Sequence, residues 1–135
     1  MAIVVGYAAT DEGRAALERA TEEARTRGVP LLVVNSTRPD HLGRRTSPEE
    51  AARADEDLDR VREQLARSGV QHEVRRPSPT PDPAEDIISA ALECDAELIV
   101  IGLRRRTPVG KLLLGSNAQR ILLDAPCPVL AVKAP

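Results

Sequence analysis

The chain has 135 residues, of which 41% are hydrophobic and 30% are charged, and its formal net charge is −2. These values fit one folded domain over residues 1–135 and exclude a chain that is disordered throughout. The negative charge, with one Tyr and no Phe or Trp, argues against a nucleic-acid partner, because both broad electrostatic attraction and aromatic stacking platforms are missing.

The first third of the chain predicts a strand, a helix and a second strand. Residues 3–5 begin a short apolar run that is typical of a strand buried on both faces. Thr10 has the position of a helix N-cap, with two acidic residues in the following turn. Gly28 fits the end of this helix, and residues 29–34 predict the second strand.

The middle of the chain predicts a second helix, a third strand and a third helix. Ser47-Pro48-Glu49-Glu50 matches a capping box and begins a helix that runs to about Arg67. Residues 70–75 alternate between apolar and polar side chains, as in a strand with one side exposed. Asp82 has the position of the next N-cap. In the helix that follows, we expect four side chains to face inward: Ile87, Ile88, Ala91 and Leu92.

The last third predicts a strand at residues 98–101, a helix from about Ser116 to Leu123 and a final strand at Val129 to Val132. The alternation of helices with apolar strands predicts an α/β fold, in which helices cover both faces of a parallel sheet. Such sheets bind ligands at the carboxyl ends of their strands. We therefore expect the candidate site in the loops after the first and fourth strands.

The loop after the fourth strand reads GLRRRTPVGKLLLGSNAQR from residue 102, and it combines glycines with basic residues and no acid. Gly102 permits close approach of a ligand to the backbone. Gly115 and Ser116 open a helix whose free N–H groups attract phosphate, with Ser116 as N-cap. The arginines add phosphate contacts. The alternative is a solvated loop followed by a purely structural cap. The Walker A pattern is absent, because Leu112 follows Lys111.

These features resemble the universal stress protein (UspA-like) family. The resemblance rests on LIVIG, on the twelve residues that separate Gly102 from Gly115-Ser116, and on the tail AQRILLDAPCPVLAVK. It extends to IVVGYAATDEGRAAL near the start. It implies a single-domain three-layer α/β/α fold of the adenine nucleotide alpha hydrolase-like type, with a five-stranded parallel sheet of order 3-2-1-4-5. It also implies a homodimer that pairs through the last strand, Val129 to Val132, and in some members binding of ATP or a related adenine nucleotide with Mg.

The resemblance implies the motif Gly-x2-Gly-x9-Gly-Ser/Thr, which nucleotide-binding members of that family carry, and this chain departs from the pattern of those members at two positions. Arg105 replaces the second glycine, and Ala8 stands where such members carry an Asp that contacts the adenosine part. Each change costs about 1–3 kcal/mol if the lost contact was buried. Tyr7, next to Ala8, either lines an adenine site or belongs to the core. The candidate ligand-binding residues are Ala8, Gly102, Arg104, Arg105, Gly115, Ser116 and Asn117.

Three functions from different classes stay open on the sequence. The first is a stress-response module that binds an adenine nucleotide or another phosphate-bearing small molecule. The second is a dimeric interaction or regulatory stress protein that binds no nucleotide. The third is an enzyme, at most a weak ATPase, and we expect no catalytic residues because no acid–base pair is evident near the loop.

The remaining side chains and the hydropathy predict a cytoplasmic protein. No stretch approaches the roughly 18–20 apolar residues that cross a bilayer, and the first residues lack the basic start of a signal peptide. Cys94 and Cys127 fit no metal or redox spacing, so we expect two structural thiols in a reducing compartment. His41 and His72 lie in polar surroundings, and we expect surface positions and no metal site.

Overall fold

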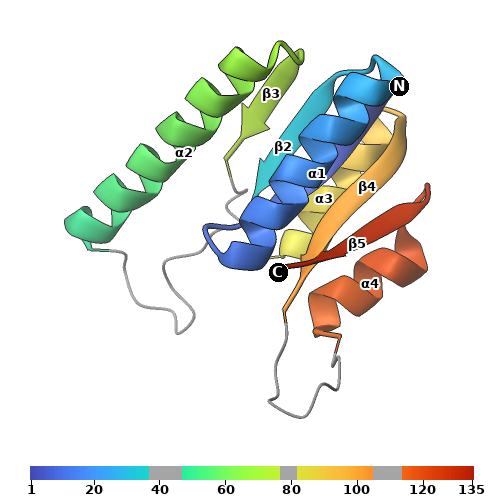
Figure 1. The fold of residues 1–135 in the computed structure, drawn as a ribbon. Helices are drawn as coiled ribbons and strands as arrows, with labels where there is room; N and C mark the ends of the chain where they lie inside the picture. Colours follow the sequence, from blue (N-terminus) through green and yellow to red (C-terminus); the bar gives the residue numbers. More distant parts are fainter. Residues whose placement is uncertain (37–46, 77–81, 105–113) are drawn as a thin grey trace.

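The structure is a computed structural model that describes residues 1–36, 47–76, 82–104 and 114–135. Nine elements follow one another in this part of the chain, and their strands form one parallel sheet of order β3-β2-β1-β4-β5 (Figure 1). The predicted α/β class and strand order are therefore confirmed. The elements are β1 (Ala2–Tyr7), α1 (Asp11–Arg27), β2 (Leu31–Asn35), α2 (Pro48–Ser68), β3 (His72–Arg75), α3 (Pro83–Glu93), β4 (Ala96–Leu103), α4 (Ser116–Asp124) and β5 (Val129–Lys133).

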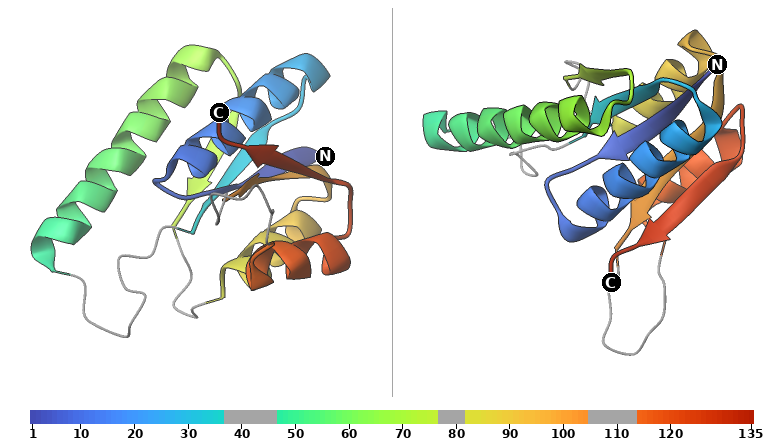
Figure 2. Two further views of the ribbon diagram at one scale, coloured as in Figure 1. Left: turned by 60° about the horizontal axis from the view of Figure 1, so that its bottom comes forward. Right: turned by 45° about the horizontal axis from the view of Figure 1, so that its top comes forward.

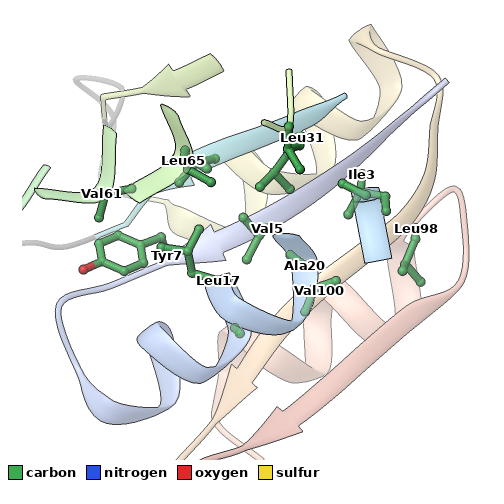
Figure 3. Close-up of a cluster of buried hydrophobic side chains, with 14 of the residues drawn as sticks. Ile3, Val5, Tyr7, Leu17, Ala20, Leu31, Val61, Leu65, Leu98 and Val100 are labelled. Carbon is green, nitrogen blue, oxygen red and sulfur yellow. The ribbon is translucent and has the colours of Figure 1, made fainter. Parts of the chain in front are cut away.

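Helices cover both faces of the sheet, so the molecule has three layers (Figures 1 and 2). Alternate residues of β1 point to opposite faces: Val5 and Tyr7 pack with α1 and α2, whereas Val4 packs with α3 and α4. Figure 3 shows the first of these clusters, in which Leu17 and Leu65 meet the sheet. Apart from Tyr7, aliphatic side chains fill both layers of the core in the described part of the chain, as the shortage of aromatic residues requires.

The predicted helix starts are confirmed by hydrogen bonds at three N-caps. The side chains of Thr10, Ser47 and Asp82 each accept a hydrogen bond of 3.1 Å from a backbone N–H three residues later. Gly28 ends α1 with a φ of 69°, in the left-handed region that favours glycine. Each cap gives a hydrogen-bond acceptor to one of the N–H groups that have no partner within the helix.

Two helices depart from the expected packing. Leu92 is 64% exposed, so its predicted inward position is wrong: in the last turn of α3 the inward positions belong to Ala90 and Ala91. The long helix α2 buries Leu58, at its centre, and Val61 and Leu65, in its C-terminal half. Its N-terminal half extends away from the sheet (Figure 2). Within the described residues, no helix is long and apolar enough to cross a membrane.

Candidate functional site

A hollow of about 460 Å³ lies at the carboxyl ends of β1 and β4. The strand order reverses between these two strands, which is where parallel sheets of this type bind ligands. The end of β4 and the start of α4 lie together at the lower side of Figure 1. Apolar walls come from the strands and from the two helices on that face, with the side chains of Ile87, Ile101 and Ile121. The predicted residues Ala8, Gly102 and Asn117 line the same hollow.

A second, smaller hollow of about 190 Å³ adjoins the first, since Gly102 and Asn117 line both. Arg104, Gly115 and Ser116 complete its predicted lining. The structure thus brings six of the seven candidate residues to one connected depression. The seventh, Arg105, lies outside the described residues, as do the other basic residues of that loop up to Lys111.

The start of α4 differs from the prediction by one residue. Gly115 is the N-cap, and Ser116 is the first helical residue, so the predicted cap at Ser116 is wrong. The reason is that the Gly115 carbonyl accepts the first helical hydrogen bond, 3.0 Å from the N–H of Gln119. Gly115 has no side chain, and no side-chain hydrogen bond caps this helix. The first N–H groups of α4 are therefore well placed to bind an anion in the smaller hollow.

Charge is distributed unevenly over the two hollows. Among the described residues that line the larger hollow, Glu12 is the one with an ionisable side chain. Among the described residues that line the smaller hollow, Arg104 is the one with an ionisable side chain. The larger hollow therefore suits an uncharged, mostly apolar group, and the smaller one suits an anion next to it.

Glu12 and Ser36 are among the lining residues of the larger hollow that the sequence analysis did not place at the site. Glu12 lies in the first turn of α1, as expected, and it also lines the hollow. Ser36 follows β2 directly, and its hydroxyl donates to the carbonyl of Tyr7 at 3.0 Å. Its position at the carboxyl end of a strand was a usable signal, since ligand sites gather at that edge.

Gly102 has a packing role that the sequence did not indicate. A Cβ atom at this position would overlap the backbone carbonyl of Glu12. Glycine at residue 102 therefore allows the backbone at the start of α1 to approach β4 closely. Gly13 is equally constrained, because its Cβ would overlap the carbonyl oxygen of Ala8. These two contacts fix the turn between β1 and α1 beside both hollows.

Tyr7 belongs to the core on the opposite face of the sheet, which settles the two interpretations of this residue. It is 1% exposed, and its hydroxyl donates to a carboxylate oxygen of Asp57 in α2 at 2.6 Å. Burial, followed by the bond to Asp57, raises the pKa of the Tyr7 phenol. In the described part of the chain, no group of three or more metal-ligating side chains gathers at any point.

Arg120 bridges the two helices that flank the larger hollow. Its guanidinium donates to Asp82 and to Glu85, both at 2.6 Å, and so joins α4 to the first turn of α3. Both acceptors are half-exposed, and two nitrogens of the guanidinium each donate to a different carboxylate. Arg120 is therefore engaged with carboxylates, although it is one of the basic residues in the loop-and-helix sequence.

We predict that this bridge makes the stability of the protein fall as the pH drops into the acid range. Arg120, and next the backbone N–H of Glu85, hold the pKa of Asp82 below its usual 3.8. The contribution of Asp82 is thus complete above that pKa and is lost as the pH falls below about 4. Arg120→Gln should lower the thermal midpoint at neutral pH and flatten its decline in acid. Arg62→Gln, which removes an exposed pair within α2, is the control. Equal acid profiles for wild type and Arg120→Gln would contradict the prediction.

The described fold and depression define a three-layer α/β protein with a candidate ligand site at the switch point of a parallel sheet. The family model described as "Universal stress protein family" matches residues 1–133. A universal stress protein of Mycolicibacterium smegmatis is 51% identical over 132 residues, which cover 97% of this chain and 96% of that protein. A universal stress protein of Thermus aquaticus is 39% identical over 134 residues, which cover 97% of this chain and 97% of that protein. The chain belongs to the universal stress protein family.

Solved structures agree with this assignment. A universal stress protein from Archaeoglobus fulgidus superimposes with a TM-score of 0.78 at 39% identity, over 98% of both chains. A structure of the universal stress protein from the same organism in complex with dAMP has a TM-score of 0.73 at 35% identity, again over 98% of both chains. The fold is thus the adenine nucleotide alpha hydrolase-like fold of this family.

Proposed function

We propose that this chain is a cytoplasmic stress-response module that binds an adenine nucleotide in the two adjoining hollows. The observation that carries the proposal is the pairing of a mostly apolar hollow with a smaller one that favours anions, joined at Gly102 and Asn117. A nucleotide has the same division into a flat, weakly polar base and a charged phosphate group. We expect no catalytic turnover.

The larger hollow is assigned to the nucleoside. Its isoleucine walls offer apolar contact to a base, and its volume of about 460 Å³ lies in the range of small-molecule sites. Ser36 uses its hydrogen in the bond to the Tyr7 carbonyl, so its oxygen is left as an acceptor for a donor of the ligand. Asn117 supplies both a donor and an acceptor at the boundary with the second hollow.

The smaller hollow is assigned to the phosphates. The uncapped start of α4 supplies backbone N–H groups at Gly115, Ser116 and Asn117, and Arg104 supplies a guanidinium. We extend this phosphate site to Arg105, the neighbouring residue in the sequence. The dAMP complex of the Archaeoglobus fulgidus relative supports the ligand class, since that protein is 35% identical over nearly the whole chain. Mg, when ATP is the ligand, adds charge neutralisation between phosphates.

We also propose that the module is a homodimer that pairs through β5. This strand is one edge of the sheet, and β4 is its one neighbour among the described strands. Edge strands expose backbone hydrogen-bonding groups that a second copy can satisfy. Light scattering on the purified chain tests this point, and a monomer at micromolar concentration would contradict it.

Calorimetric titration at low salt tests nucleotide binding. ATP with and without Mg, ADP, AMP, cyclic AMP and dAMP are compared with adenosine. We expect one site per chain in the micromolar range for at least one nucleotide. Arg104→Gln should weaken the binding of nucleotides about tenfold, the equivalent of about 1.4 kcal/mol, and should change the binding of adenosine much less. No heat with any nucleotide up to millimolar concentration would overturn the proposal.

A second function, a dimeric interaction protein that binds no nucleotide, is favoured by two features of the larger hollow. Ala8 offers no side-chain acceptor there, and Glu12 adds an acidic residue to its lining. Ala8→Asp distinguishes the two functions. If the hollow holds the nucleoside, the new carboxylate should tighten binding about tenfold by accepting a ligand hydrogen bond. Ala9→Asp, beside a different hollow, is the matched control. If neither the wild type nor Ala8→Asp binds nucleotide, the interaction protein is the better account.

A further inference from the structure

Cys94 and Cys127 both lie at the end of the sheet opposite the candidate site, where β4 and β5 begin. Cys94 ends α3 two residues before β4, and Cys127 lies two residues before β5. These two strands are parallel neighbours, and both begin on the right of Figure 1. The N–H of Ile99 donates to the carbonyl of Pro128 at 3.0 Å, which fixes the entry to β5 against β4.

Both side chains also lie on the same face of the sheet. Each is a free cysteine of intermediate burial, and each packs against the cluster that contains Ile99 and Ile121. The register pairs Ile99 with Val129, so Cys127 is level with Glu97 (two positions before each), and Cys94 lies three residues earlier, at the end of α3. Both thiols therefore lie on one face, in the region where β4 and β5 begin. The two cysteines are 33 positions apart in the sequence (127 minus 94), so the sequence alone does not indicate that they lie in one region.

The charges around the two thiols distinguish them. Burial raises the pKa of both. An ionised Cys94 further raises the pKa of Cys127, so the two sulfurs lie within reach of one another's charge. Around Cys94, the guanidinium of Arg75 and the amino group of Met1 act in the opposite direction, against a smaller effect of Glu93. Cys94 is therefore the thiol with cations nearby to stabilise its thiolate, although burial keeps its pKa raised.

We propose that Cys94 and Cys127 are an oxidation site, a dithiol that a hydroperoxide converts into a reversible disulfide within the chain. The proposal rests on the shared position of the two side chains and is independent of nucleotide binding. Within a reducing compartment, disulfides of this kind are transient and report on oxidants.

The chemistry balances in two steps. The Cys94 thiolate attacks the terminal peroxide oxygen, the O–O bond breaks, and Cys94 becomes a sulfenic acid while the peroxide leaves as water or an alcohol. The Cys127 sulfur then attacks the Cys94 sulfur, the S–O bond breaks, and the leaving hydroxide takes the proton of the Cys127 thiol and departs as water while the S–S bond forms. The two thiols lose two electrons, and the peroxide gains them. A thiol reductant reverses the change by exchange.

The disulfide would enclose β4 and α4 in a covalent loop. This loop contains Gly102, Arg104 and the start of α4, so oxidation would restrict the part of the chain that holds the candidate phosphate site. Because burial raises the pKa of both thiols, the reaction is slow at neutral pH and accelerates as the pH rises and more thiolate forms.

The test uses the full chain, hydrogen peroxide as the oxidant and diamide as a second, peroxide-independent oxidant. After oxidation, the protein is unfolded, its free thiols are alkylated, and its intact mass and linked peptides are measured. We expect a monomeric chain that has lost two hydrogens, takes up no alkylating agent, and regains both thiols with dithiothreitol. Cys127→Ser should stop at a sulfenic acid on Cys94 that dimedone traps, and Cys94→Ser should react more slowly than Cys127→Ser.

The remaining outcomes each decide a part of the proposal. A disulfide with diamide and none with peroxide would confirm that the thiols meet and would overturn peroxide as the oxidant. Disulfides between chains, or two alkylated thiols after both oxidants, would overturn the pair itself. Circular dichroism of both serine variants ensures that a missing disulfide does not come from a failure to fold.

Discussion

Gly102→Ala should lower the free energy of unfolding by about 1–3 kcal/mol, the usual cost of overpacking a tight contact. The added Cβ would overlap the backbone carbonyl of Glu12, which belongs to the first turn of α1 and has no rotamer with which to move aside. Glycine is needed at residue 102 for space and not for conformation, since its φ is outside the positive range found at Gly28 and Gly69. Denaturant unfolding followed by circular dichroism measures the loss.

Gly6→Ala is the matched control for this prediction. Gly6 lines the same hollow, but its added Cβ would meet the Cδ1 atom of Ile87 at 2.7 Å, and that side chain can change rotamer. Its loss of stability should therefore be clearly smaller than that of Gly102→Ala. Equal losses for the two variants would show that α1 shifts freely and that its contact with β4 does not fix the turn beside the site.

The fold could be predicted because its signals are local. Apolar runs of strand length and the N-caps Thr10, Ser47 and Asp82 act within a few residues, and the structure has all of them. Alternation of strands and helices then predicts a parallel sheet covered on both faces. The order 3-2-1-4-5 came from the family resemblance, because alternation alone allows several orders.

The parts of the site that escaped prediction depend on contacts between distant segments. Glu12 lines the hollow, and its backbone packs closely on Gly102, which no spacing within the first loop indicates. Gly115, and not Ser116, is the N-cap because the Gly115 carbonyl accepts the first backbone hydrogen bond of α4. Such a bond shifts the end of a helix by a residue or two, which the sequence does not indicate. The position of Cys94 and Cys127 at adjacent strand entries follows from the pairing of β4 with β5. Leu92 is exposed because the last turn of α3 needs only its two alanines to cover the sheet.

The Tyr7 phenol should make the protein lose stability in alkali by up to about 1.4 kcal/mol per pH unit. Burial and the bond to Asp57 raise the pKa of this phenol in the folded chain above its ordinary value of 10.0, which the unfolded chain retains. Above pH 10 the unfolded chain therefore releases a proton that the folded chain keeps, so the unfolded state is favoured. The contribution of Tyr7 is complete below that pH and declines as the pH rises through the folded pKa.

Tyr7→Phe separates this effect from other alkaline losses. The variant removes the hydroxyl bonded to Asp57 and should lose about 1–3 kcal/mol at neutral pH, since a partly buried carboxylate is left without its donor. Its unfolding free energy should then fall less steeply than that of the wild type above pH 10. Tyr7 is the single Tyr in a chain without Trp, so phenolate absorbance in the wild type reports this residue alone. Absorbance that titrates near pH 10 while circular dichroism still shows a folded chain would mean that the phenol is open to solvent and that its bond to α2 contributes little. A titration that coincides with unfolding would show that the buried phenol keeps its proton until the fold is lost.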